Sequence, residues 1–467
     1  MFGKKGRKPR LLLAVALAAV MVLPRAAVVK ALPEAEQQVV DAAAENIYYV
    51  MKILLEEYVG RDLTPKDLYQ AAMRGMSGLL DEYSQYMPDD EMTQLNEMLT
   101  GSTEVIGVVL QENAEGGIEV ESVLPGSSAE SGGIQKGDVI LKINGMDLRG
   151  LAVSNAVSLI ANSETSEIVL ELARQGEVLS LTLEKTVLRL PSIHVENVEE
   201  LTTVENAEGI GYVYISVVGE ETARELREVI ASFKDEGKNK LILDMRGNPG
   251  GLLGAAEEIC KMLVPEGPIV HMLDKYGEKH TLYSEVAELP FEKMAVLIDG
   301  ETASAAEIIA SAMQDSGTAV VVGRQSYGKG VIQTLYALQW QDGFKFTTME
   351  YFRRNGDKIN GIGVIPDIVV PFVEPLDESA AAGGQDESRW APELWEILKS
   401  LGYDPGPKDA AYSEALRQAV ERFQNDRGIS GGPDLTAETI RVLNEEYSAY
   451  FLENDVDVRR AVEVLGE

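Results

Sequence analysis

The amino-acid sequence predicts a multidomain α/β (α+β) protein built around a core in which strands and helices alternate. Three regions of different periodicity support this prediction. Residues 34–100 carry apolar side chains at helical spacing, residues 101–188 contain short β-rich runs separated by glycine turns, and apolar strands alternate with amphipathic helices after residue 189. A chain of 467 residues has room for about three domains.

The first 31 residues differ from the rest of the chain. A cluster of lysine and arginine residues precedes an unbroken apolar run at 11–23, and small residues follow it. This is the pattern of a secretory signal peptide. The run is shorter than the ~20 apolar residues of a membrane-spanning helix. We therefore expect residues 1–31 to be a signal peptide, with a membrane anchor as the alternative. Both interpretations predict an extracytoplasmic protein, secreted or held at the cell envelope.

Composition excludes several classes of function. The formal net charge of −34 argues against nucleic acid as a partner, because phosphate binding needs a basic face. A single cysteine, Cys260, leaves no intramolecular disulfide. The three histidines, His194, His271 and His280, match no zinc-binding spacing. We expect neither a metal nor a cofactor.

Residues 32–100 are predicted to be an N-terminal helical region, in which Thr64 and Pro65 begin a helix. Residues 101–188 are predicted to form a small, partly open β-barrel. Its expected strands are 105–110, 118–123, 139–143, 168–172 and 179–183, with short helices at 128–131 and 153–161.

Two stretches within this barrel, Val123–Ala129 and Gly133–Gly145, resemble a PDZ domain. PDZ domains bind C-terminal peptides by adding them as a strand to an open sheet edge. The resemblance implies a carboxylate-binding loop at Gly107, where glycine lets backbone N–H groups turn toward the ligand. The alternative for Gly107 is a β-bulge. The implied side-chain pocket is lined by Ile106, Val108, Val157 and Ile160.

Residues 189–373 are predicted to form a sheet with parallel strands and helices on its faces. The expected strands are 210–217, 240–244, 295–299 and 319–322, and the expected helices are 222–234 and 252–263. Sites in such sheets form where strands end and helices begin. Gly250 and Gly251 follow one strand, and Ser304 follows another.

Ser304 permits two interpretations. With Glu307 three residues later it forms a capping box, which requires no function. Alternatively, it is a nucleophile held where helix N-terminal N–H groups point at it. A serine nucleophile needs a base. No G-x-S-x-G elbow is present and no histidine has an evident carboxylate partner, so we do not expect a histidine triad.

Lys329 is the candidate base, because a lysine made neutral by burial can replace histidine. It stands between Gly328 and Gly330, which permit close backbone approach. If the following residues are a strand, Gln333 shares the face of Lys329 and can orient its amine. The alternative is an exposed turn lysine, the commonest fate of this residue type.

Ordered motifs make the chain similar to the carboxyl-terminal processing peptidases, which are Ser-Lys serine proteases with an inserted PDZ domain. Besides the PDZ motif these are Leu79–Tyr86, Leu241–Gly251, Thr302–Glu307, Tyr327–Gln333 and Gly361–Asp367. Gly247 and Tyr327 stand where the family usually has Asn and Phe.

The resemblance implies a role for each residue of the site. Ser304 is the nucleophile, Lys329 the general base and Gln333 the residue that positions the base. The N–H groups of Ala305 and of Gly250 or Gly251 form the oxyanion hole. Arg174, near the end of the PDZ domain, is the best match to a regulatory arginine.

The C-terminal part of the chain is predicted to contain a flexible linker at 374–389, a three-helix module at 390–450 and an amphipathic or disordered tail at 451–467. The segments Leu401–Tyr403, Ala419–Gln424 and Leu435–Thr439 resemble a peptidoglycan-binding repeat. The alternative is a helical adaptor without a ligand.

The expected function is that of an extracytoplasmic serine endopeptidase that binds proteins with apolar C-termini through its PDZ domain. Peptidoglycan, a membrane reached through the N-terminal segment, and a second copy in a homodimer are its further expected partners. The alternative is a catalytically silent PDZ scaffold localised to the cell wall, which the intact Ser304, Lys329 and Gln333 argue against. A third hypothesis, that the protein is a peptidoglycan hydrolase, is supported only by the three-helix module at 390–450.

Overall fold

The computed structural model describes residues 32–466 except 114–115, 162, 164, 203–206, 372, 374, 378–389, 409–410, 431 and 433. The predicted signal peptide or anchor at 1–31 and most of the predicted linker lie outside the described residues. Among the described helices, none is both long and apolar enough to span a membrane.

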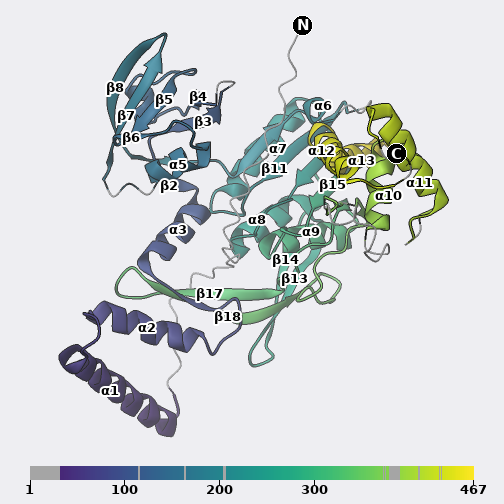
Figure 1. The fold of residues 1–467 in the computed structure, drawn as a ribbon. Helices are drawn as coiled ribbons and strands as arrows, with labels where there is room; N and C mark the ends of the chain where they lie inside the picture. The colour runs from purple at the N-terminus through teal and green to yellow at the C-terminus, as the bar shows by residue number, and fades with distance from the viewer. Residues whose placement is uncertain are drawn as a thin grey trace.

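A six-stranded sheet forms the centre of the fold, in the order β10-β11-β12-β15-β16-β19 (Figure 1). Its strands are β10 (Ile193–Glu196), β11 (Ile210–Ile215), β12 (Lys240–Asp244), β15 (Lys293–Ile298), β16 (Ala319–Gly323) and β19 (Ile368–Val369). All neighbours pair in parallel except β10. Parallel pairing needs crossovers, which include α7 (Thr222–Asp235), α8 (Leu253–Leu263) and α9 (Ala305–Asp315). The predicted fold class is confirmed.

Register brings the ends of the central strands to one edge of the sheet. Asp244 at the end of β12 pairs with Leu297 of β15, which pairs with Val322 of β16. The loops that follow these strands therefore meet at the carboxyl edge of the sheet, where ligand sites form in such folds.

Both faces of the sheet are covered. Because strand side chains alternate, Leu241 and Leu243 pack with α7, α8 and α9, whereas Ile242 faces a second core. This second core is completed by α6 (Val198–Leu201) and by α13 (Val456–Gly466) near the C-terminus.

The C-terminal residues are thus not a disordered tail, and that alternative of the sequence prediction is wrong for residues 456–466. Helix α13 is amphipathic, and its contacts are with β15, β16 and β12. The apolar side chains that it buries against the sheet are Val458, Ala461, Val462 and Leu465. Burial of this stripe provides the free energy that orders the segment.

A second sheet lies beside the first and carries part of the candidate site. It has the order β1-β18-β13-β14, with β17 also paired to β18. The strands are β1 (Gln85–Met87), β13 (Gly267–Asp274), β14 (Lys279–Ser284), β17 (Val331–Ala337) and β18 (Gly343–Phe352). Through β1, the N-terminal region is built into the same sheet as the segment that follows Lys329.

The PDZ-like region forms a sheet of its own, away from the central one (Figure 1). It consists of β3 (Val108–Glu112), β4 (Ile118–Val123), β5 (Val139–Ile143), β6 (Met146–Asp147), β7 (Glu167–Arg174) and β8 (Glu177–Glu184), with α4 (Ser128–Ser131) and α5 (Val153–Ala161). The chain enters through β2 (Ser102–Val105) and leaves through β9 (Thr186–Arg189), which pair with each other. This pairing brings the two ends of the region together, as an insertion requires.

Helices occupy both ends of the described part of the chain. Helices α1 (Glu34–Glu57), α2 (Pro65–Ser77) and α3 (Asp89–Thr100) precede the PDZ-like region, and Thr64 caps α2 as predicted. Near the other end, α10 (Ala391–Ser400), α11 (Glu414–Arg427) and α12 (Ala437–Glu453) share one core. Leu376, in the predicted linker, is buried in that core, and its N–H donates to Asn444 Oδ1 on α12. At Leu376, the predicted linker is therefore packed against the three-helix module.

The packing of α13 predicts that Leu465→Ala lowers the free energy of unfolding by ~2 kcal/mol or more, because it leaves a cavity against the central sheet. Urea denaturation followed by circular dichroism measures the change. The control is Glu463→Ala, on the exposed face of the same helix, with an expected change within ~0.5 kcal/mol. Equal stability of the two variants would contradict the packing described here.

Candidate active site

Ser304 lies in the turn between β15 and α9 with a backbone conformation that is rare for a serine. Its φ is +56° and its ψ is −117°, a strained region for a residue with a Cβ. Asp299 holds this turn, because its Oδ1 accepts the N–H groups of Glu301 and Thr302 at 3.0 and 3.1 Å. Strained, over-determined residues of this kind cluster at functional sites.

The hydroxyl of Ser304 does not cap the helix that it precedes. Glu307 Oε2 accepts the Ser304 N–H at 2.7 Å, which is the bond that the glutamate of a capping box makes. However, Ser304 Oγ is buried and has no hydrogen-bond partner among the described residues. The cap interpretation therefore accounts for Glu307 but not for the serine hydroxyl.

Glu307 is a buried carboxylate that ties the Ser304 turn to the Lys329 loop. Its Oε2 also accepts the Lys329 N–H at 2.9 Å, and its Oε1 accepts the Gly328 N–H at 2.7 Å and the Ser326 hydroxyl at 2.5 Å. Burial raises the pKa of Glu307, and these hydrogen bonds oppose that effect.

Tyr351 on β18 joins the same two residues from another side. Its buried hydroxyl lies 2.6 Å from Lys329 O and 3.1 Å from Ser304 O. Glu307 thus binds the N–H groups of Ser304 and Lys329, and Tyr351 contacts their carbonyl groups. The backbones of the two residues are held in one fixed arrangement.

The Lys329 side chain is buried, and its Nζ donates to Gln333 Oε1 at 2.9 Å. Burial, assisted by the positive charge of Lys345, lowers the pKa of Lys329 to about 7 against the opposing charges of Asp81 and Glu307. An amine with this pKa is neutral in a substantial fraction near neutral pH. Lys329 is therefore not an exposed turn lysine.

The structure does not place Lys329 Nζ in hydrogen-bond contact with Ser304 Oγ, since that hydroxyl has no partner among the described residues. Catalytic hydrogen bonds are often long in ligand-free enzymes and shorten when substrate binds. The ring of Tyr83, from the N-terminal region, lies 5.1 Å from Lys329 Nζ. This distance is within the range of a cation–π contact.

The Gly250–Gly251 turn lies directly against Ser304. A Cβ on Gly250, whose φ is +95°, would be 2.9 Å from Ser304 Cβ and 2.8 Å from Ala305 N, so only glycine fits there. The Gly250 N–H donates to Asn248 Oδ1 at 2.8 Å. No described group accepts a hydrogen bond from the N–H of Gly251 or Ala305. Of the two predicted glycines, Gly251 is the better candidate oxyanion donor.

The predicted peptide-binding residues lie together in the PDZ-like region. Ile106 and Ile160 are buried in its core, Val108 packs against that core, and Val157 is half exposed on α5. Gly107 has a φ of +85° and approaches Ser127 so closely that any Cβ would clash. The loop at Gly107 thus has the close backbone approach expected of a glycine position.

Arg174 lies in the PDZ-like region, at the end of β7. It donates to both carboxylate oxygens of buried Asp138, at 2.7 and 2.6 Å, and to Gly133 O at 2.8 Å. The structure therefore pairs the predicted regulatory arginine with Asp138 and does not bring it to Ser304 or Lys329.

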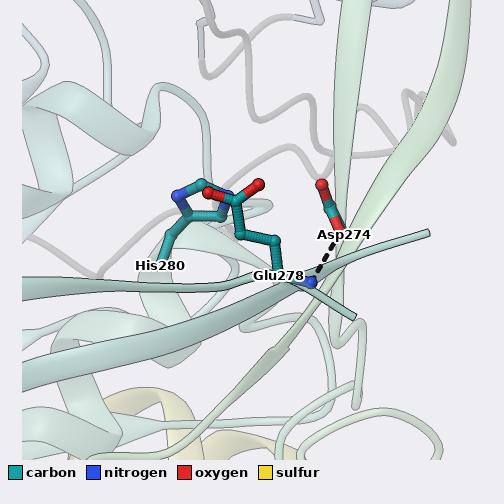
Figure 2. A group of neighbouring side chains, drawn as sticks. All are labelled: Asp274, Glu278 and His280. Atoms are coloured by element: carbon teal, nitrogen blue, oxygen red, sulfur yellow. Dashed lines mark hydrogen bonds between the residues drawn. The ribbon is translucent and has the colours of Figure 1, made fainter. Parts of the chain in front are cut away.

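One group of described side chains has the composition of a metal site. Asp274, Glu278 and His280, at the β13–β14 turn, offer ligand atoms that lie within 4.8 Å of one another (Figure 2). The Asp274 carboxylate already accepts the N–H groups of Tyr276 and Glu278 at 2.8 and 2.9 Å. These bonds explain its position as part of the turn without any ion.

The sequence analysis missed three residues that shape the candidate site. Tyr351 and Lys345 stand on β18, and Tyr83 lies before β1, all far from Ser304 and Lys329 in the chain. No local pattern marks them, because their roles arise from strand pairing. Tyr83 falls within the quoted Leu79–Tyr86 motif, which was the only signal available in the sequence.

Comparisons with protein-family models give three matches. Residues 209–370 match peptidase family S41, residues 95–173 match the PDZ domain, and residues 392–443 match the model described as "Putative peptidoglycan binding domain". The three matches follow one another along the chain in the order that the sequence motifs predicted.

Proteins of similar sequence are named carboxy-terminal processing proteases. The carboxy-terminal processing protease CtpA of Bacillus subtilis (strain 168) is 29% identical over 408 residues, which cover 85% of this chain and 85% of that protein. CtpB of the same organism is 28% identical over 430 residues, covering 91% and 88%. A solved photosystem II D1 C-terminal processing protease is 23% identical, with a TM-score of 0.41, and covers 69% of this chain and 86% of its own.

These matches confirm the predicted resemblance and the predicted enzyme class. The chain is a serine-type peptidase that resembles the carboxyl-terminal processing proteases, and it carries a PDZ domain.

The contacts of Tyr351 predict that Tyr351→Phe lowers the free energy of unfolding by ~1–3 kcal/mol, because the buried Lys329 carbonyl group loses the hydroxyl that donates to it at 2.6 Å. Urea denaturation measures the loss. Tyr283→Phe removes a hydroxyl from an exposed ring on β14 and serves as the control, with an expected change within ~0.5 kcal/mol. An unchanged stability of Tyr351→Phe would show that its contacts do not hold the two loops.

Proposed function

We propose that this peptidase cleaves protein substrates with Ser304 as the nucleophile and Lys329 as the general base. One observation carries the proposal. A buried lysine with a lowered pKa shares two buried side chains, Glu307 and Tyr351, with a strained serine whose hydroxyl has no partner among the described residues.

The reaction begins when the neutral amine of Lys329 accepts the proton of the Ser304 hydroxyl. Ser304 Oγ forms a bond to the scissile carbonyl carbon, and the carbonyl oxygen becomes an oxyanion. The N–H groups of Gly251 and Ala305 stabilise that charge. The Lys329 ammonium then donates its proton to the leaving amine as the peptide bond breaks. Water, deprotonated by Lys329, releases the acyl group in the same way.

Gln333 serves as a positioning residue in this proposal. Its Oε1 accepts from Lys329 Nζ, which fixes the direction of the amine without changing its charge. A neutral amide suits this role, because a carboxylate at the same place would favour the ammonium form and raise the pKa of the base.

The proposed substrates are proteins with apolar C-termini, bound at the PDZ domain by strand addition. A cleft of about 800 Å³ lies between the PDZ-like region and the peptidase core. It is lined by Ala161 of α5, by the end of α3, by the segment around Val217 and by Pro249 beside Gly250. A chain bound at the PDZ domain would enter this cleft to reach Ser304.

The proposed location is extracytoplasmic, at the cell envelope. The match of residues 392–443 to a peptidoglycan-binding model supports a wall partner. The basic and apolar pattern of residues 1–31 supports export or a membrane anchor. A homodimer belongs to the same proposal. The alternative function, a catalytically silent PDZ scaffold, does not account for the lowered pKa of Lys329.

The roles of Ser304 and Lys329 predict that Ser304→Ala and Lys329→Ala each reduce cleavage of an unfolded protein with an apolar C-terminus by at least ~10³-fold. The matched control is Lys358→Ala, an exposed lysine paired with Glu350, which should retain wild-type activity. Gel electrophoresis with mass spectrometry of the products gives the rate. Wild-type activity in both variants would refute the mechanism, whereas an inert wild type would favour the scaffold.

The pKa of Lys329 predicts the pH dependence. The active form is the neutral amine, which predominates above its pKa, so kcat/KM should rise through about pH 7 and then level off. The Lys345 charge lowers that pKa, so Lys345→Met should move the midpoint to higher pH. A midpoint that Lys345→Met leaves unchanged would show that another group titrates.

A further inference from the structure

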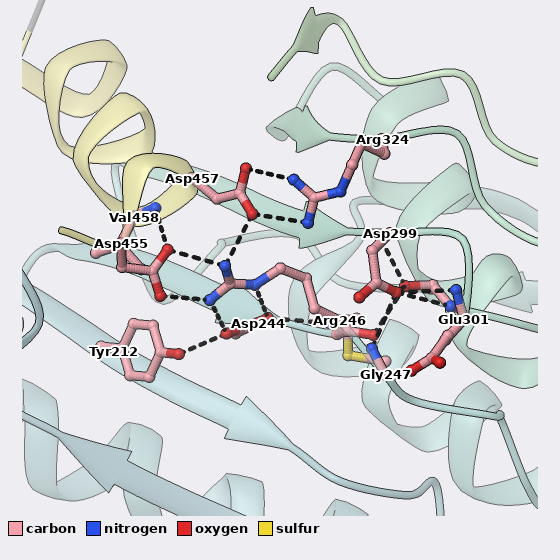
Figure 3. A network of polar contacts seen from close by, with 12 residues as sticks. Tyr212, Asp244, Arg246, Gly247, Asp299, Glu301, Arg324, Asp455, Asp457 and Val458 are labelled. Carbon is pink, nitrogen blue, oxygen red and sulfur yellow. Dashed lines mark hydrogen bonds and ion pairs between the residues drawn. The ribbon is translucent and has the colours of Figure 1, made fainter. Parts of the chain in front are cut away.

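A buried cluster of charged side chains joins the C-terminal helix α13 to the carboxyl edge of the central sheet (Figure 3). Asp455 immediately precedes α13, Asp457 lies in its first turn, Arg246 follows β12 and Arg324 follows β16. Arg246 donates to Asp455 and to Asp457 at 2.8 Å, and Arg324 donates to both oxygens of Asp457 at 2.9 Å. Asp457 therefore bridges the two arginines.

The cluster is shielded from solvent and extends into the sheet. The side chains of Asp455 and Asp457 are 6% and 5% exposed, and Arg246 is 14% exposed. Arg246 also pairs with fully buried Asp244, which accepts the Tyr212 hydroxyl. Buried, multiply hydrogen-bonded pairs are screened little by salt, and removal of one partner leaves an uncompensated charge.

Each arginine stands in a loop that carries part of the proposed catalytic site. Arg246 lies in the loop that continues to Gly250 and Gly251, and the N–H of the next residue, Gly247, donates to Asp299 Oδ1 at 3.0 Å. Asp299 is the residue that holds the Ser304 turn. Arg324 opens the loop that continues through Ser326 and Gly328 to Lys329.

We propose that Asp455 and Asp457 are positioning residues of the peptidase, and that α13 belongs to its catalytic unit. By fixing Arg246 and Arg324, they set the relative position of the loop with the oxyanion donors and the loop with the general base. The proposal rests on the proposed roles of Ser304 and Lys329. Misplacement of catalytic groups by about 1 Å costs up to ~10²-fold in rate, so fixed loop positions matter to the reaction.

Two sets of side chains at α13 have different roles. One set attaches the helix to the sheet, and the other fixes the two loops. The apolar stripe of Val458, Ala461, Val462 and Leu465 already attaches the helix to the sheet. The carboxylates of Asp455 and Asp457 instead contact the side chains of the two loops. Their directional hydrogen bonds to Arg246 and Arg324 fix where the two loops lie relative to the helix.

The test uses the full-length chain and the variant Asp457→Asn, which keeps the size of the side chain and removes its charge. We expect kcat for a short peptide substrate, and the rate at which a fluorophosphonate labels Ser304, to fall about tenfold. KM should stay within twofold, at a temperature where thermal melting shows the variant folded. The matched control is Glu463→Gln on the same helix, whose partner is Arg460 on the surface; it should match wild type.

A double-mutant cycle extends the test. If Asp457 acts through Arg324, then Arg324→Gln lowers the labelling rate, and Arg324→Gln with Asp457→Asn lowers it less than the product of the two single effects. Asp457→Glu, which keeps the charge, should recover part of the rate. If Asp457→Asn does not fold, the labelling rate of Arg324→Gln tests the proposal instead, because Arg324 is the more exposed partner.

Wild-type labelling and kcat in folded Asp457→Asn would overturn the inference. A lowered melting temperature with wild-type labelling below it would also overturn it, because α13 would then serve stability only. An unlabelled, inactive wild-type chain would instead refute the proposed function, so the two failures are distinguishable.

Discussion

The candidate site depends on the hydrogen bonds that the Glu307 carboxylate accepts. It accepts N–H groups from both the Ser304 turn and the Lys329 loop, which approach it from different strands of the central sheet. A buried carboxylate with four donors has little freedom to move, so its two oxygens define how the loops lie against each other. Tyr351 adds contacts to the carbonyl groups of the same residues. The strained φ of Ser304 is sustained because these bonds over-determine the turn.

The electrostatics of the site follow from the same packing. Lys329 lies where burial and a second buried lysine oppose its charge, while Asp81 and Glu307 favour it. The result is a pKa of about 7 rather than a fully suppressed charge, which suits the proposed role of Lys329 as a base that accepts and returns a proton. The N-terminal region takes part in this balance, because β1 pairs with β18 and brings Asp81 and Tyr83 beside the amine.

The central sheet explains why distant parts of the chain meet. Parallel register places the ends of β12, β15 and β16 at one edge, and each of the loops that follow carries one part of the site. Helices cover both faces. The face opposite α7, α8 and α9 is covered in part by α13, so the chain returns to the peptidase core after the three-helix module. Asp455 and Asp457, at the N-terminal end of α13, then reach the same edge as the loops of the candidate site.

The sequence by itself determined the local motifs and many of the elements, but not the strands of the second sheet. Periodicity located β12, α5 and α7 to within a residue or so, and glycine turns marked the PDZ region, because these signals depend on neighbouring residues. It also drew attention to Ser304, Lys329 and Gln333 through short motifs. Only the tertiary structure decided that Glu307 binds two loops and that, among the described residues, the N–H of Gly251 has no acceptor whereas that of Gly250 has one. It also decided that Arg174 pairs with Asp138 and that residues 456–466 cover the sheet. Most of these contacts join residues that are distant in the sequence. The sequence of a short amphipathic segment does not indicate which surface will bury it.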